Sequence, residues 1–257
     1  MKPQRVRDLE LDDGSFKICA TLTSRNEYAL MNDLLKLKGK AFDLVEWRAD
    51  YYTADDENRE NLTLKPLRLI RKMVGNKPII ATFRDQREGG QRKMDPSKLL
   101  ELRRDHVVSG LVDIIDLELM NFRKDGQAPE TGGEYQQLLQ QANEKGIKVI
   151  LSTHDFNRTP EVEDLIELLR LEEKFGADFA KIACFAKEKR DAEKLLEASK
   201  AAVKLLSIPH IALAMGEEGV VTRYSKNLSS SAVTFASIRE SSAPGQLSLE
   251  ELHEKIR

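Results

Sequence analysis

Short apolar runs rich in β-branched residues recur along this sequence at intervals of about 30 residues. Longer stretches with a helical spacing of apolar residues separate them, so the pattern predicts strands that alternate with helices. Strands that are each followed by a helix build a parallel sheet, either closed into a barrel or doubly wound. The predicted strands are Lys17–Leu22, Asp43–Ala49, Pro78–Arg84, Val112–Leu119, Lys148–Phe156, Phe179–Phe185, His210–Gly216 and Ala232–Ile238.

The length and the first predicted turn favour the barrel. A doubly wound sheet normally has a glycine-rich turn after its first strand, and none follows Leu22. The chain has 257 residues, which suits one α/β barrel, and no linker or change of composition marks a second domain. We therefore expect residues 1–257 to form a single (β/α)8 TIM barrel. Residues 6–16 alternate apolar and polar side chains around Asp13-Gly14, which predicts a β-hairpin that closes the bottom of the barrel.

Two of the predicted helices have clear ends. Residues 134–146 and 159–176 carry amphipathic spacing between predicted strands. In the second, Thr159 precedes Pro160, an arrangement typical of an N-cap followed by the first helical position. Gly176 is expected to end that helix.

Charge and cysteine usage exclude several classes of partner. Lys+Arg 41 against Asp+Glu 43 gives a formal net charge of −2, so we expect neither nucleic acid nor a membrane as a partner. No apolar run approaches the roughly 20 residues that span a bilayer, and the charged first residues are unlike a signal peptide, so we expect a cytoplasmic protein. Cys19 and Cys184 lie far apart in apolar runs without metal-ligand spacing. Both are expected to be buried thiols, and we expect no metal and no other cofactor.

One predicted strand contains a lysine. Parallel strands covered by helices are normally almost continuous in Val, Ile, Leu and Ala, so Lys181 within Phe179–Phe185 needs an explanation. Side-chain alternation places Lys181 with Phe179 and Ala183 on the face that we expect to line the barrel interior. Burial of an ammonium is costly and favours the neutral amine, which is a nucleophile toward a carbonyl. The alternative is a structural lysine paired with a carboxylate at the end of the strand.

Further polar residues gather near the carboxyl ends of other predicted strands, where barrel active sites are assembled. A lone histidine or a lone Glu–Arg pair is usually structural, but several such residues at one rim favour a catalytic site. These residues are Glu46, Arg48, Arg84, Glu88, His154, Met215 and Arg223.

Lysine, histidine and glutamate together indicate imine chemistry. Lys181 would condense with a substrate ketone, and the protonated imine would acidify the adjacent carbon. His154 would move protons, since imidazole titrates near neutral pH, and Glu88 would hold the orientation and tautomer of the ring. Arginines bind carboxylates through a bidentate fork, so the substrate is expected to be a small anionic molecule. These residues alone predict an imine-forming lyase or an aldolase that acts on a small hydroxylated keto acid.

Motifs along nearly the whole chain resemble those of the type I 3-dehydroquinate dehydratases. Each motif is short, but their combination in this order is specific to that family. They are EWRAD (46–50), TFRDQREGG (82–90), DLEL (116–119), STHDF (152–156), AKIA (180–183), MGEEGVVTR (215–223) and SAPGQ (242–246).

The resemblance implies a homodimeric, metal-free barrel that converts 3-dehydroquinate to 3-dehydroshikimate in the shikimate pathway by syn elimination through an imine. It implies that Lys181 forms the Schiff base, that His154 is the general acid and base, and that Glu88 positions His154. It further implies a set of substrate-binding residues: Arg223, Gln246 and Ser242 at the carboxylate, Glu46, Arg48 and Arg84 at the ring hydroxyls, and Thr21, where some relatives have Ser.

An apolar part of the pocket and a closing loop complete the predicted site. The segment around Ser242–Gln246 is a Pro-Gly loop of the kind that closes over a ligand and excludes water. The residues expected to line the face of the substrate ring are Phe156, Met215, Phe235 and Ala243.

The site residues are also compatible with two functions other than dehydration. A class I aldolase also uses an imine-forming lysine on a barrel strand, but a phosphorylated substrate needs a glycine-rich cradle after the last strands. The segments MGEEG and SAPGQ hold few glycines, and Arg223 suits a carboxylate. A non-catalytic carboxylate-binding barrel would have no need for Lys181, His154 and Glu88 together. The sequence does not separate a biosynthetic from a catabolic role.

Overall fold

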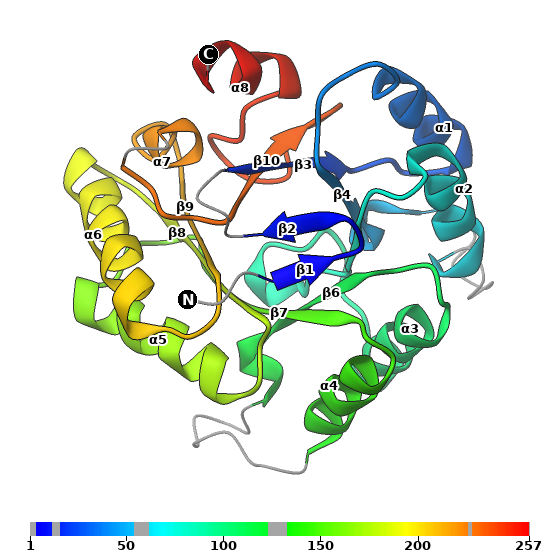
Figure 1. Ribbon diagram of the computed structural model, residues 1–257, viewed down its shortest axis with the longest axis horizontal. Coiled ribbons are helices and arrows are strands. Elements are labelled where there is room, and N and C mark those ends of the chain that lie inside the picture. The colour runs from blue at the N-terminus through cyan, green and yellow to red at the C-terminus, as the bar shows by residue number, and fades with distance from the viewer. Residues whose placement is uncertain (1–3, 12–15, 54–61, 123–132, 226–227, 257) are drawn as a thin grey trace.

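A computed structural model describes all residues except 1–3, 12–15, 54–61, 123–132, 226–227 and 257. Its main sheet has eight parallel strands in the order β10-β3-β4-β5-β6-β7-β8-β9 within the described residues. Ala232 N donates to His210 O at 2.9 Å beside the two outermost strands, so the sheet is nearly closed into a barrel (Figure 1). The strands are β3 (Lys17–Leu22), β4 (Leu44–Arg48), β5 (Ile79–Thr82), β6 (Ile114–Glu118), β7 (Lys148–Asp155), β8 (Phe179–Phe185), β9 (His210–Met215) and β10 (Val233–Ser237).

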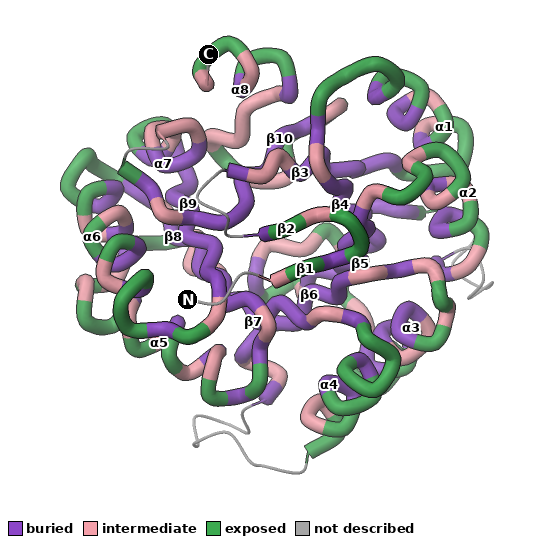
Figure 2. The backbone as a smooth tube through the Cα atoms, viewed as in Figure 1, coloured by how far each residue is buried: buried purple, intermediate pink, exposed green. Residues whose placement is uncertain are grey.

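Helices surround the barrel and cover the outward faces of its strands (Figure 2). The α-helices are α1 (Glu27–Lys36), α2 (Leu64–Val74), α3 (Pro96–Val108), α4 (Glu134–Glu144), α5 (Val162–Lys174), α6 (Lys189–Leu205), α7 (Val221–Tyr224) and α8 (Leu249–Ile256). Within the described residues, short 3-10 helices follow strands at η1 (Ala49–Tyr51), η3 (Gln86–Glu88) and η4 (Leu119–Phe122). The alternation of strands and helices confirms the predicted (β/α)8 barrel.

Side chains alternate along each barrel strand between the interior and the helices, and most of them are buried on both faces. On β8, Phe179 packs inward against residues such as Ile80 and Ile150 of other strands. Ala180 and Ile182 point outward and pack with the buried residues of α5 and α6. The predicted placement of Lys181 on the inward face is therefore confirmed.

A two-stranded hairpin, β1 (Gln4–Val6) paired with β2 (Leu9–Leu11), lies across one end of the barrel (Figure 1). Val6 and Leu11 join the inward-facing apolar cluster of the barrel strands, so the hairpin closes the bottom as predicted. Its turn lies at Arg7-Asp8, where Arg7 has a positive φ of 53°. The predicted centre at Asp13-Gly14 was wrong in register. With the turn at Arg7-Asp8, Val6 and Leu11 both face the barrel interior, whereas a turn at 13–14 would put them on one strand with their side chains in opposite directions. Residues 13–14 themselves lie outside the described residues.

The end of α5 was predicted correctly and its beginning was not. Gly176 has a φ of 95° just after the helix, as expected for a glycine that ends it. The helix begins at Val162 with Glu161 as the N-cap residue. The Thr159 hydroxyl donates instead to Phe185 O at 2.9 Å, so it anchors the β7–α5 loop to the end of β8.

Both cysteines are free and buried, as expected for structural thiols: Cys19 faces the barrel interior and Cys184 faces the helices. Across the described ranges, no helix is long and apolar enough to cross a lipid bilayer.

Candidate active site

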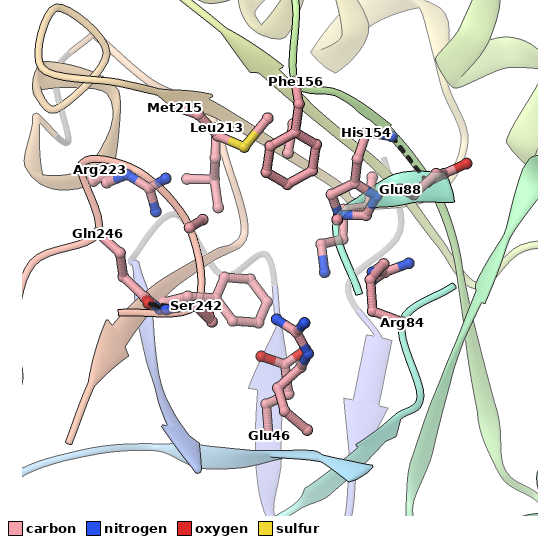
Figure 3. A pocket seen from close by; sticks show the side chains of 16 residues that line it. Glu46, Arg84, Glu88, His154, Phe156, Leu213, Met215, Arg223, Ser242 and Gln246 are labelled. Atoms are coloured by element: carbon pink, nitrogen blue, oxygen red, sulfur yellow. Dashed lines mark hydrogen bonds and ion pairs between the residues drawn. The ribbon is translucent and has the colours of Figure 1, made fainter. Parts of the chain in front are cut away.

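A pocket opens at the carboxyl ends of the barrel strands, and Figure 3 shows the side chains that line it. All of the predicted site residues except Thr21 line this pocket, and Thr21 makes hydrogen bonds with two of the lining residues, Glu46 and Gln246. Three further lining residues, Gly89, Ala183 and Leu213, were not predicted. The lining residues that were predicted are Glu46, Arg48, Arg84, Glu88, His154, Phe156, Lys181, Met215, Arg223, Phe235, Ser242, Ala243 and Gln246.

Lys181 reaches the pocket from β8 and has a carboxylate partner. Its Nζ lies 2.8 Å from Asp116 Oδ2 of β6 and 4.7 Å from the centre of the Phe235 ring. Burial alone would raise the pKa of Asp116, but the charges of Arg84 and Lys181 outweigh it and hold that pKa well below its usual range. Asp116 therefore supplies a counter-charge for Lys181, and such a carboxylate partner is what the alternative of a structural lysine predicted.

His154, near the end of β7, is held by Glu88 of η3. Glu88 Oε2 lies 2.8 Å from His154 Nδ1 and accepts the backbone N–H of His154 at 3.0 Å. Because Oε2 already acts as an acceptor, we assign the ring proton to Nδ1, which leaves the Nε2 lone pair free. Burial lowers the pKa of His154 and raises that of Glu88, so both shifts favour uncharged forms.

Two glycines let the segment after β5 place Glu88. Gly89 has a φ of 84°, and a Cβ there would lie 2.2 Å from the Phe156 ring. A Cβ on Gly90 would lie 1.9 Å from Arg84 O. The turn after Glu88 is thus packed against Phe156 and the end of β5, and a larger residue at either position would displace it.

Arg84 is paired with two carboxylates within the protein. Its guanidinium contacts Asp116 at 2.9 Å and Glu118 at 2.8 Å, and it donates to Ser152 Oγ. Glu118 also pairs with Arg103 of α3, so consecutive ion pairs link α3 through Glu118 to Arg84 in the pocket. Burial alone would lower the pKa of Arg84, but the charges of Asp116 and Glu118 outweigh it and raise that pKa.

Glu46 and Arg48, two residues apart on β4, both face the pocket as predicted. Arg48 makes a bidentate pair with Asp50, with both N···O distances at 2.8 Å. Glu46 accepts hydrogen bonds from Thr21 at 3.3 Å and from Thr82 at 2.9 Å. Among the described residues, threonine hydroxyls hold Glu46, so its carboxylate can also accept from a ligand hydroxyl.

Arg223 of α7 differs from the other two arginines. Arg223 is only 3% exposed, yet no carboxylate among the described residues pairs with its guanidinium. Its Nε also has no hydrogen-bond partner among those residues. Burial lowers its pKa to about 10. A buried guanidinium without a counter-ion is costly, and a bound anion would remove that cost.

The loop after β10 closes the pocket beside Arg223 (Figure 3). Gln246 Oε1 accepts hydrogen bonds from the Ser242 backbone at 2.7 Å and from its hydroxyl at 3.0 Å. Gln246 Nε2 donates to Thr21 Oγ1 at 3.3 Å, which links the loop to β3. At the other side, Gly216 N donates to Pro244 O at 3.0 Å.

The sequence carried a signal for some of the residues that were missed. Asp116 and Glu118 alternate within a strand that should be apolar, which is the signal that identified Lys181. Leu213 gives no such signal, because an apolar residue on a barrel strand is ordinary core. No group of three or more His, Cys, Asp or Glu is arranged to hold a metal ion within the described ranges.

Comparison with known proteins agrees with this geometry. The family model for type I 3-dehydroquinase matches residues 18–257. The 3-dehydroquinate dehydratase of Clostridium kluyveri is 35% identical over 254 residues, covering 98% of this chain and 96% of the relative. That of Escherichia coli is 35% identical over 253 residues, with the same coverage.

Two solved structures share the fold along almost the whole chain. The 3-dehydroquinate dehydratase of Geobacillus kaustophilus gives a TM-score of 0.90 at 32% identity, covering 99% of this chain and 95% of that one. The type I enzyme of Clostridium difficile, solved with covalently modified comenic acid, gives 0.89 at 30% identity, covering 99% and 96%. The chain belongs to the type I 3-dehydroquinase family.

Proposed function

We propose that this chain dehydrates 3-dehydroquinate to 3-dehydroshikimate through an imine between Lys181 Nζ and the substrate ketone. The observation that carries the proposal is the composition of one pocket. It holds a buried lysine, a His154–Glu88 pair and Arg223, which has no carboxylate partner in the part of the chain that the structure describes. These groups match a ketone, a mobile proton and a carboxylate on one small molecule.

Imine formation begins with loss of a proton from Lys181, whose ammonium pairs with Asp116. The amine then adds to the ketone carbon, the nitrogen loses a proton and the carbonyl oxygen takes one up, which gives a neutral carbinolamine. This hydroxyl leaves as water after a second protonation, and the nitrogen lone pair forms the C=N bond. His154 Nε2 is the group that carries these protons, because its buried ring is neutral.

Elimination follows from the iminium. The positive nitrogen acidifies the adjacent carbon, His154 removes a proton from it, and the electron pair moves into an enamine. The enamine expels the hydroxyl on the next carbon, and the proton held by His154 goes out with it as water, so both groups leave from one face. Hydrolysis of the imine then releases the product and restores Lys181.

The remaining pocket residues bind and orient the ring. Arg223 receives the carboxylate in a bidentate contact, with Ser242 and Gln246 beside it. Arg48 and Arg84 are already paired with carboxylates, so they offer their remaining N–H groups to ring hydroxyls, together with Glu46. The apolar lining excludes water around Lys181; it comprises Phe156, Met215, Phe235 and Ala243.

Trapping of the imine tests the proposal. The purified protein is incubated with 3-dehydroquinate and reduced with borohydride, which converts C=N to a stable amine, and the adduct is located by peptide mass spectrometry. We expect added mass on Lys181 and enone absorbance during turnover, and both should vanish in Lys181→Ala. Lys148→Ala is a matched control, since Lys148 is also a strand lysine paired with an aspartate, Asp178, but lies outside the pocket. An active Lys181→Ala protein would refute the mechanism.

The same experiment separates the two alternatives. A class I aldolase would form an adduct with other keto acids and cleave a carbon–carbon bond, without enone absorbance from 3-dehydroquinate. A non-catalytic binding barrel would bind the ligand without adduct or turnover.

We further propose that the chain acts in the shikimate pathway in the cytoplasm and that it forms a homodimer. Family membership supports all three statements. Light scattering after size-exclusion chromatography tests the last, and a mass of one chain at micromolar concentration would refute it.

A further inference from the structure

Glu172 of α5 is buried where an apolar side chain is expected. The face of α5 that packs on the barrel carries Leu165, Leu169 and Glu172, at the spacing of one helical stripe. Glu172 is 0% exposed. A carboxyl group in this layer is costly unless it is hydrogen-bonded, so its contacts should account for its presence.

The carboxyl group of Glu172 binds two neighbouring strands. Its Oε2 accepts the backbone N–H of Lys181 at 2.7 Å, and its Oε1 accepts the Thr153 hydroxyl at 2.8 Å. N–H groups of successive residues in a strand point to opposite neighbours. Since Ala180 N donates to Pro209 O beside β9, Lys181 N points toward β7. Glu172 therefore lies at the seam between β7 and β8.

This seam carries the two reacting side chains. Thr153 directly precedes His154 on β7, and Lys181 is itself the residue whose N–H Glu172 accepts. Glu88 makes the equivalent contact with His154, since it accepts the backbone N–H of that residue. Each reacting residue thus has its main chain held by a buried glutamate, one from inside the pocket and one from the helix layer.

We infer that Glu172 is a positioning residue that fixes the backbone of Lys181 relative to His154 and thereby sets the rate of imine formation. The inference rests on the proposed imine mechanism. Glu172 does not line the pocket and does not touch the substrate. It acts through the main chain of Lys181, so its loss should slow the covalent step rather than weaken binding.

The protonation state of Glu172 suggests the conservative variant. Burial raises its pKa well above the usual range, and its two hydrogen bonds only partly offset this. A neutral glutamine has the same shape, so it can accept from Lys181 N through its oxygen and donate to Thr153 Oγ1 through its amide. Glu172→Gln should therefore keep both contacts, whereas Glu172→Ala removes both.

The experiment measures the single-turnover rate of borohydride-trapped adduct together with kcat and KM. For Glu172→Ala we expect a rate of imine formation about 10- to 100-fold lower, with KM within about threefold, because small displacements of reacting groups cost rates of this order. Glu172→Gln should lie within about threefold of the unmodified protein. Ser199→Ala is the matched control: Ser199 is a buried helix residue that contacts His210 of β9, away from the pocket. It should lower thermal stability and leave the trapping rate unchanged.

Thr153→Val provides a second variant that removes one contact without changing shape, and we expect a smaller reduction of the trapping rate. If Glu172→Ala does not fold, an unchanged trapping rate in Thr153→Val overturns the inference. A folded Glu172→Ala with an unchanged trapping rate, a change confined to KM, or equal losses in Glu172→Ala and Glu172→Gln would also overturn it. Absence of any adduct on Lys181 in the unmodified protein would instead refute the proposed function.

Discussion

Replacement of Arg223 by methionine should stabilise the protein while impairing substrate binding. Burial lowers the pKa of Arg223 from its usual value to about 10, and each pKa unit corresponds to about 1.4 kcal/mol between the two protonation states. The charged form is therefore disfavoured in the folded state by up to about 3 kcal/mol. Arginine is charged in both the folded and the unfolded chain at pH 7, so this penalty is fully present there and declines only above pH 10. Methionine removes the charge and retains most of the apolar stem.

Arg84→Met is the matched control in the same pocket, and the opposite sign is expected for it. Arg84 is paired with Asp116 and Glu118, both fully buried, so its removal leaves their charge uncompensated. Breaking a buried pair in this way typically costs about 3–5 kcal/mol. The same substitution should thus raise the free energy of unfolding at Arg223 and lower it at Arg84.

Urea unfolding at pH 7 measures both effects, with and without quinate, an analogue of the substrate that lacks the ketone. Quinate should stabilise the unmodified protein and have little effect on Arg223→Met. Loss of a charge-assisted contact worth about 2–3 kcal/mol should raise KM roughly 30- to 150-fold, with a smaller change in kcat. A destabilised Arg223→Met that still binds quinate would refute both the unpaired charge and its role in carboxylate binding.

Three further outcomes are expected. His154→Ala should still give a trapped adduct, but turnover should fall about 10²- to 10⁴-fold because proton transfer is lost; normal turnover would remove His154 from this role. Burial lowers the pKa of His210 from 6.5 to about 4, so the unfolded chain binds more protons between these values. Its contribution to stability should therefore fall by about 2 kcal/mol between pH 7 and pH 5. Urea unfolding should show a weaker acid dependence in His210→Asn, and equal slopes would contradict this. Gly245→Ala would place a Cβ 2.3 Å from Gly216 O, so the loop should move off the pocket and raise KM in a substrate titration; an unchanged KM would show that the loop tolerates the displacement.

The barrel and the location of the pocket could be predicted from sequence because both depend on local periodicity. Alternation along a strand fixes which residues face inward, and the carboxyl ends of parallel strands meet at one rim. Lys181, Glu46 and Arg48 were therefore assigned to one site before any tertiary contact was known. The same rule applied to Asp116 and Glu118 would have added them.

Local patterns failed where a distant contact changes the role of a residue. Thr159 has the sequence context of an N-cap, but its hydroxyl donates to Phe185 O, which lies 26 residues further along the chain. The hairpin turn falls at Arg7-Asp8 because Val6 and Leu11 must both face the barrel interior. Glu172 lies on the same face of α5 as Leu165 and Leu169. That position in the helix gave no sign that its carboxyl group would bind the main chain of Lys181.

The sequence by itself placed the lysine, the histidine, Glu46, Glu88 and the three arginines of the pocket at or after the carboxyl ends of the barrel strands. Only the tertiary structure decided which of those charges have partners. Arg84 and Lys181 share the carboxylate of Asp116, which lies 65 residues before Lys181, whereas Arg223 has no such partner among the described residues. An ion pair depends on separations of a few ångströms between strands distant in sequence, and closure of the barrel sets those separations. The closed barrel thus leaves Arg223 as the one pocket arginine without a carboxylate partner in the described chain.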